Sequence, residues 1–330
     1  MKFGDIARKW LQNLTFLAVA VTLFMAPNAA LAQEAESADA AVEVAAEAEA
    51  PAFEYFGADM IKGQPEPGGL GFQDQYSPNG DYALWMHDAI LMPIITVISL
   101  FVLFLLLWVV FRYRRGANPV ASKTSHNTLI EVVWTVIPII ILLVIAVPSI
   151  RLLAAQYESP PEDAITIKAN GYQWYWGYEY TDEGFGFDSF MIGAFEDKRM
   201  SPDVEAQLID AGYTRDEFLL ATDTQVVVPV NKVVVMQVTG ADVIHSWTIP
   251  AFGVKQDAVP GRIGQLWFKA EKEGIYFGQC SELCGKDHAY MPITVKVVSQ
   301  EEYEQWLQEA KEEYAAAPAF DSEYQIASAN

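Results

Sequence analysis

Basic residues are scarce in this chain. Its 330 residues include 21 Lys and Arg against 43 Asp and Glu, so the formal net charge is −22. Nucleic acid is a polyanion and would be repelled, and we expect no nucleic acid among the partners. The acidic surface favours small basic proteins instead, because opposite charges steer association.

Cysteine is also rare. The only two, Cys280 and Cys284, lie four positions apart in a segment that also contains His288 and Met291. A disulfide is one interpretation, because an exported domain meets an oxidising compartment. The neighbouring imidazole and thioether make a metal site the interpretation to test first.

Charged residues are absent from two long runs, 89–111 and 132–150, and the second contains Pro138 and Pro148. The first run can cross a bilayer core of about 30 Å. We predict transmembrane helices over 89–111 and 131–153, joined by a loop at 112–130, and therefore a lipid bilayer as a partner.

The charges beside these runs predict the orientation. The loop carries Arg112, Arg114, Arg115 and Lys123, whereas residues 33–88 contain one lysine and many acids. By the positive-inside rule, the loop is cytoplasmic and both flanking regions lie outside.

The first residues predict export. Basic residues precede an apolar run at 14–25, and Ala30, Leu31 and Ala32 follow. We predict a signal peptide at 1–32 that is cleaved after Ala32, with an uncleaved anchor helix as the alternative. Export of the mature N-terminus agrees with the orientation from the loop.

The rest of the chain divides by composition. Residues 33–88 form an acidic arm outside the membrane, and 33–50 lack the apolar residues needed for a core. Residues 154–318 predict an all-β sandwich ending in an amphipathic helix at 300–314, with a helical insertion at 201–212 and a mobile tail at 319–330. The strand-like runs include 226–238, broken by Pro229 and Asn231, and 243–249, 263–268, 275–278 and 293–298.

The number of soft donors helps to identify the metal. His245, inside a strand-like run, is the best candidate for a second imidazole beside His288. Two thiolates, two imidazoles and the Met291 thioether exceed the four ligands of one zinc or one blue copper. If both thiolates bridge two copper ions, each ion receives two sulfurs and one imidazole, which leaves weak axial positions for Met291 and a backbone carbonyl.

These motifs resemble a known family. The sequence Cys280-Ser281-Glu282-Leu283-Cys284-Gly285, with His288 and Met291 after it and His245-Ser246-Trp247 before it, is similar to subunit II of aa3-type haem-copper cytochrome c oxidases, as in alphaproteobacteria. The resemblance covers nearly the whole mature chain and implies a cupredoxin-like outer domain. It implies a dinuclear copper centre, CuA, with His245, Cys280, Cys284, His288 and Met291 as side-chain ligands and the backbone carbonyl of Glu282.

The resemblance also implies a function. Electrons from cytochrome c would enter at CuA and pass to subunit I, which reduces oxygen to water and pumps protons, with subunit III as a further partner. The location would be a bacterial inner membrane with the copper domain in the periplasm. The chain offers no spare histidine pairs in its membrane helices, so the haems would belong to subunit I.

Further roles follow from the resemblance, each with a simpler alternative. Trp174, in the aromatic run 171–178, would accept the electron, although such aromatics also form membrane-interface belts. Asp242, with Glu183 and Asp188, would dock a basic cytochrome c, although most surface carboxylates are merely solvated. Glu131 would begin a proton pathway, although a carboxylate there also favours a helix N-terminus.

A second metal is implied as well. The Glu282 side chain would help to bind magnesium or manganese at the interface with subunit I, which suits a carboxylate oxygen. Asp257 and Arg262 match residues that line that region, and a surface turn with a charge pair is their alternative.

Three other protein classes share parts of the pattern. A copper chaperone resembles thioredoxins and has its cysteines early in the domain before a helix, whereas here they come late between strand-like runs. A quinol oxidase subunit II usually lacks the copper ligands, and nitrous oxide reductase lacks the two-helix anchor.

Overall fold

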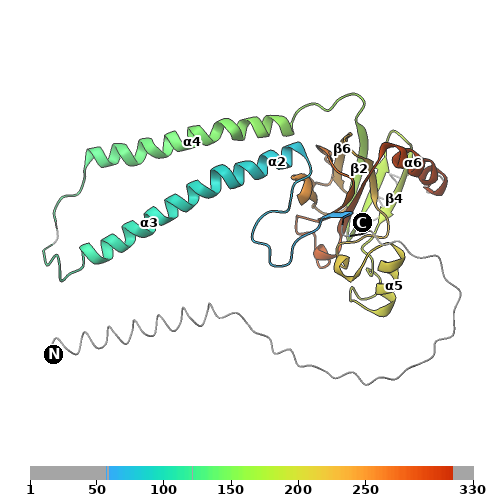
Figure 1. The fold of residues 1–330 in the computed structure, drawn as a ribbon, viewed down its shortest axis with the longest axis horizontal. Coiled ribbons are helices and arrows are strands. Elements are labelled where there is room, and N and C mark those ends of the chain that lie inside the picture. Colours follow the sequence, from blue (N-terminus) through green and yellow to red (C-terminus); the bar gives the residue numbers. More distant parts are fainter. Residues whose placement is uncertain (1–56, 58, 121, 315–330) are drawn as a thin grey trace, which may run out of the picture. The chain divides into compact units, whose positions relative to one another are not determined.

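The computed structural model describes residues 57, 59–120 and 122–314 (Figure 1). The predicted signal peptide at 1–32, the acidic segment 33–50 and the tail at 319–330 lie outside the described residues. After the short strand β1 (Ile61–Gly63), two long helices follow along the chain, and the other strands of a β-sheet domain come after them. This order confirms the predicted fold class, a helical hairpin followed by a β-sandwich.

The first long helix begins before the uncharged run. It consists of α2 (Pro78–Trp85), the π-helical turn η1 (Met86–Leu91) and α3 (Met92–Arg112). Ser77 caps it, because its Oγ accepts a hydrogen bond from Gly80 N at 3.1 Å and donates one to Phe252 O at 2.7 Å. The helix therefore extends into residues assigned above to the N-terminal arm, because the cap and Pro78 set its start and hydropathy does not.

The second long helix, α4 (Thr128–Gln156), is also longer than the predicted span 131–153. The side chain of Asn127 caps it by accepting from Ile130 N at 3.2 Å. Neither α3 nor α4 has a buried residue among those described, and most of their large apolar side chains are exposed. Such surfaces are stable in lipid or against other membrane helices, as expected of a membrane protein.

The β domain contains two main sheets and a hairpin. Its sheets have the strand orders β4-β3-β2-β6-β9 and β1-β10-β11-β5, and β7 pairs with β8. The strands are β1 (Ile61–Gly63), β2 (Ile165–Tyr172), β3 (Tyr175–Tyr180), β4 (Phe185–Ser189), β5 (Val226–Pro229), β6 (Val233–Gly240), β7 (His245–Ile249), β8 (Val254–Ala258), β9 (Gly264–Lys269), β10 (Gly274–Gln279) and β11 (Pro292–Val298). Because β1 pairs with β10, part of the predicted arm also belongs to a sheet.

One apolar core joins both sheets. Trp176 and Tyr178 of β3 pack in the same cluster as Trp247 of β7 and Tyr276 of β10. The side chains of Trp176 and Tyr178 are 0% and 1% exposed, so the interface-belt alternative is wrong for these two residues. Their large aromatic surface stabilises the sandwich instead.

Two helices cover parts of the β domain. In the insertion between β4 and β5, α5 (Pro202–Asp210) buries Val204 and Leu208 in a small cluster that includes Phe277 of β10. At the C-terminal end, α6 (Gln300–Tyr314) buries Tyr303 and packs Trp306 against the main core. These helices match the predicted segments 201–212 and 300–314 closely.

Candidate metal centre

The segment from Cys280 to Met291 is a loop held at both ends by a strand pair. β10 and β11 are antiparallel, and Gln279 lies opposite Pro292 in their register. Cys280 and Met291 are the first residues beyond that pair, so the register alone brings them together. Ser281 N donates to Ser246 O at 3.0 Å, which ties the loop to β7 beside His245.

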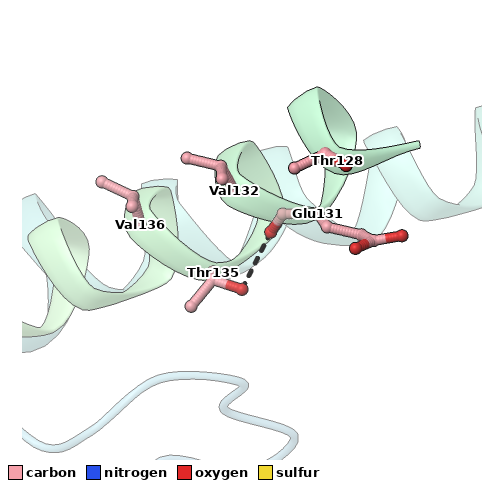
Figure 2. A pocket seen from close by; sticks show the side chains of 5 residues that line it. All are labelled: Thr128, Glu131, Val132, Thr135 and Val136. Atoms are coloured by element: carbon pink, nitrogen blue, oxygen red, sulfur yellow. Dashed lines mark hydrogen bonds between the residues drawn. The ribbon is translucent and has the colours of Figure 1, made fainter. Parts of the chain in front are cut away.

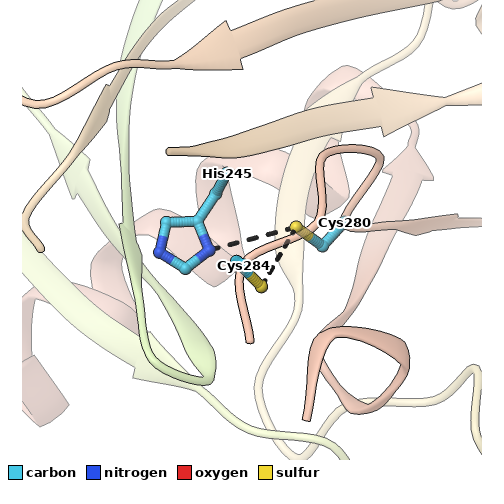
Figure 3. A group of neighbouring side chains, drawn as sticks. All are labelled: His245, Cys280 and Cys284. Carbon is cyan, nitrogen blue, oxygen red and sulfur yellow. Dashed lines mark hydrogen bonds between the residues drawn. The ribbon is translucent and has the colours of Figure 1, made fainter. Parts of the chain in front are cut away.

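The predicted sulfur and nitrogen donors converge. Cys280 Sγ lies 3.8 Å from Cys284 Sγ and 3.9 Å from His245 Nδ1 (Figure 3). Cys284 Sγ lies 3.6 Å from His288 Nδ1 and 3.5 Å from Met291 Sδ. The Glu282 carbonyl oxygen lies 3.3 Å from Cys280 Sγ.

The donors divide into two sets, one around each sulfur. Cys280 is in contact with His245 Nδ1 and the Glu282 carbonyl, and Cys284 with His288 Nδ1 and Met291 Sδ. Metal bonds of about 2.0–2.3 Å to sulfur and nitrogen place two donors of one ion about 3–4 Å apart. The observed separations fit that range, and the donor set fits two copper ions that share both sulfurs better than one zinc ion.

Both cysteines are free thiols. Their sulfurs are 3.8 Å apart, whereas a disulfide bond is about 2.05 Å long. The disulfide alternative is therefore absent from this structure.

The two thiols differ in acidity. Burial raises the pKa of Cys280, but hydrogen bonds from His245 and from backbone groups outweigh it and leave that pKa below its usual value. Burial and the neighbouring Cys280 thiolate raise the pKa of Cys284. The protein alone thus favours one thiolate, and bound metal ions would supply the positive charge for a second.

His245 is held from two sides. Its Nε2 is 2.8 Å from Asp242 Oδ1, so the proton on Nε2 leaves Nδ1 free as a metal donor. On the other side is Gly171 of β2, where a Cβ would lie 2.8 Å from His245 Cδ2. Only glycine therefore leaves room for the imidazole without displacement.

Trp174 lies in the turn between β2 and β3. It contacts the metal loop, which is the segment from Cys280 to Met291. Its Nε1 donates to Cys284 O at 3.3 Å, and Gln173 Nε2 donates to the same oxygen at 2.9 Å. Lys286 Nζ is 5.3 Å from the Trp174 ring centroid. The indole is half-buried, so it joins the protein surface to a candidate ligand residue.

Known proteins are similar to this chain in amino-acid sequence. The family model of the cytochrome c oxidase subunit II periplasmic domain matches residues 165–298, and the model of its transmembrane domain matches 65–152. Cytochrome c oxidase subunit 2 of Cereibacter sphaeroides is 59% identical over 254 residues, which are 76% of this chain and 83% of the relative. The chain belongs to the cytochrome c oxidase subunit II family.

Two further proteins of the cytochrome c oxidase subunit II family are also similar to this chain. The cytochrome c oxidase subunit 2 of Arabidopsis thaliana is 42% identical over 248 residues, 73% of this chain and 89% of the relative. The crystal structure of the periplasmic domain of subunit II of cytochrome oxidase of Bradyrhizobium japonicum is 49% identical, covers 47% of this chain and 99% of that one, and has a TM-score of 0.39.

Family membership confirms the resemblance noted in the sequence. It makes the chain a membrane-bound subunit of cytochrome c oxidase, an oxidoreductase complex. Family membership also excludes the alternative that the chain is a copper chaperone.

The residues predicted for a second metal are less closely grouped. Glu282, Asp257 and Arg262 are exposed, and Asp257 Oδ1 accepts from Ser246 Oγ at 2.9 Å. Among the described residues, the ion pairs include none between Asp257 and Arg262. Subunit I would have to supply further ligands, so magnesium or manganese at Glu282 stays a prediction.

Glu131 stands at the start of α4. Its Oε1 accepts from Asn127 N at 3.2 Å, and Thr135 Oγ1 donates to Glu131 O at 2.9 Å (Figure 2). This is the helix-capping role that the sequence left open as the simpler alternative. The cap does not exclude proton transfer, because only Oε1 of the carboxylate accepts the capping bond.

Several supporting residues were not predicted. Gly171, Gln173 and Trp176 lie in the aromatic run 171–178, but only Trp174 was given a role there. Trp176 Nε1 donates to Met291 O at 3.3 Å. Asp242 was predicted as a docking residue, but its carboxylate also accepts from Gln173 N at 2.8 Å and contacts His245. Spacing gives no signal for such contacts, because they join separate strands.

Proposed function

We propose that this subunit accepts electrons from a basic cytochrome c and passes them to subunit I of the oxidase, which reduces oxygen to water and pumps protons. The observation that carries the proposal is the division of the donors around two sulfurs 3.8 Å apart. His245, Cys280, Cys284, His288, Met291 and the Glu282 carbonyl would hold two copper ions. When bound, this CuA pair would supply a one-electron carrier that needs no substrate chemistry from the chain.

Trp174 is proposed as the residue that receives the electron. The exposed part of its half-buried ring can lie against a bound haem edge, and its hydrogen bond to Cys284 O gives a short route to the loop. The burial of both cysteines supports the route, because excluding water from the donors limits reorganisation when the charge changes.

Asp242 is proposed to act twice. Its contact with Nε2 fixes the orientation of the His245 ring, and its exposed position adds negative charge beside Trp174. A basic cytochrome c would be steered by that charge together with the net charge of the whole chain.

Stopped-flow reduction by a basic cytochrome c tests electron transfer and steering together. We expect the second-order rate constant to fall steeply as the ionic strength rises, because salt screens exposed charges beyond about 10 Å at 0.1 M. Reduction by a small neutral reductant is the control and should change little. A rate constant for cytochrome c that stays flat with ionic strength would contradict steering, and no reduction at all would contradict the function.

Glu131 is proposed as the cytoplasmic start of a proton pathway into subunit I. Glu131→Gln should lower the turnover of the oxidase several-fold, because glutamine keeps the capping oxygen but cannot carry a proton. Reduction of the subunit by cytochrome c should be unchanged, which separates proton uptake from electron transfer. Normal turnover in the variant would leave Glu131 with the capping role alone.

We further propose that the protein lies in a bacterial inner membrane with loop 112–130 in the cytoplasm and the copper domain in the periplasm, in contact with subunits I and III. The four basic residues of the loop support this orientation. Labelling of the loop by an impermeant reagent from the periplasmic side would contradict it.

Magnesium or manganese held partly by Glu282 is the remaining proposal, and a manganese resonance that disappears in Glu282→Ala would identify it.

A further inference from the structure

A turn in the insertion between β4 and β5 has an unusual backbone conformation and contacts the metal loop. Asp197 and Lys198 both have positive φ angles, 53° and 55°. Residues other than glycine rarely adopt this conformation, and two in succession persist only where surrounding contacts hold them. The contacts that hold this turn include those of the Lys198 side chain.

Lys198 contacts residues on both sides of His288. Its Nζ is 3.4 Å from Asp287 Oδ2, directly before His288, and 5.9 Å from the ring centroid of Tyr290, two residues after it. The short helix η4 consists of His288–Tyr290 and begins directly after Asp287. One ammonium group thus contacts the residues that frame a candidate copper ligand.

The ion pair of Lys198 is more shielded from solvent than most others in the protein. The side chains of Lys198 and Asp287 are 27% and 17% exposed, whereas those of Arg215 and Glu205 are 63% and 37% exposed. Exposed pairs contribute little because water and salt screen them, and the shielded pair is screened less. The nearby aromatic face adds a cation–π contact to the same ammonium.

The insertion also holds the other end of the loop. Gln279, directly before Cys280, donates from Nε2 to Leu219 O at 3.1 Å. The insertion has its own small core, in which Val204, Leu208 and Tyr213 are buried against β10. It is therefore an ordered body that contacts the loop before its first cysteine and around its last histidine.

We propose that Lys198 is a positioning residue that holds η4 and so keeps His288 in place as a donor to the metal centre. The inference rests on the proposed copper function, but it concerns a residue outside the ligand set. Ligand orientation by residues beyond the ligands commonly changes metal affinity by about 10–100-fold. Lys198 would act by packing and charge, without touching the metal.

Copper release to a chelator from the full chain tests this role. Lys198→Met should release copper about tenfold faster than wild type and alter the copper hyperfine pattern in electron paramagnetic resonance, because η4 loses its anchor. Lys198→Arg should restore a slow release, since a guanidinium can make both contacts. Arg199→Met is the matched control, because it removes the same charge from an exposed neighbouring side chain and should leave release unchanged.

Hydrogen exchange of residues 286–291 in the copper-free chain is the second readout. Lys198→Met should speed exchange there and leave β2 and β3 unchanged, and Asp287→Asn should do the same if Lys198→Met fails to fold. Equal release and equal exchange in Lys198→Met and Arg199→Met would overturn the proposal. Wild-type protein that binds no copper would contradict the copper function instead, and the exchange comparison would still decide whether Lys198 holds η4.

Discussion

Serine in place of Cys284 is expected to reduce the copper content from two ions per chain to one or none, and to abolish reduction of the subunit by cytochrome c. Cys284 Sγ lies within 3.8 Å of Cys280 Sγ, His288 Nδ1 and Met291 Sδ, so it joins the two donor sets. A serine hydroxyl is a hard donor that ionises with difficulty, and copper prefers soft thiolate sulfur. Metal analysis and stopped-flow reduction of the same preparation measure both effects.

Met291→Leu is the matched control for this variant. Leucine keeps the apolar volume of a side chain that is 1% exposed but would remove a weak thioether donor from the proposed centre. We expect both copper ions to remain, with a changed reduction potential. Two copper ions bound with native spectra in Cys284→Ser would contradict the bridging assignment.

Alanine in place of Trp174 is expected to slow reduction by cytochrome c about a hundredfold, equivalent to about 3 kcal/mol of activation free energy, while copper content stays at two. The variant removes both the ring that is proposed to meet the donor haem and the hydrogen bond to Cys284 O. The side chains of the candidate metal ligands lie on other segments, and the variant removes none of them. Stopped-flow kinetics with the copper spectrum recorded on the same sample separate the two effects.

Two controls sharpen the Trp174 result. Trp174→Phe keeps a ring but loses the Nε1 donor, so a rate between those of wild type and alanine would divide the effect between ring and hydrogen bond. Tyr157→Ala removes an aromatic side chain that is 81% exposed, outside the run 171–178, and should change nothing. Reduction of Trp174→Ala at the wild-type rate would exclude its role.

The metal loop was predictable because its information is local. Cys280, Cys284, His288 and Met291 lie in one loop, and an antiparallel strand pair closes it, so their proximity follows from the chain itself. His245 was predictable for a different reason, because its strand-like run placed it in the same sandwich. The two-helix hairpin was equally clear, since uncharged runs of that length have few other stable environments.

Other features depend on contacts between distant segments and could not be predicted. The start of the first helix depends on the bond from Ser77 to Phe252 O, and hydropathy carries no sign of it. β2, β3 and β4 were not specified as strands, and the aromatic residues of β3 also suited a membrane interface, whereas the core buries Trp176 and Tyr178. The contact of Lys198 with Asp287 could not be predicted either, because it joins a turn of the insertion to a segment far away in the sequence.

Metal analysis with electron paramagnetic resonance on the full-length subunit, purified alone, tests the central claim most directly. Two copper ions per chain that share one unpaired electron are expected, since the two sulfurs and their separate donor sets suit a bridged pair. One zinc ion, a single isolated copper or no metal would contradict the account.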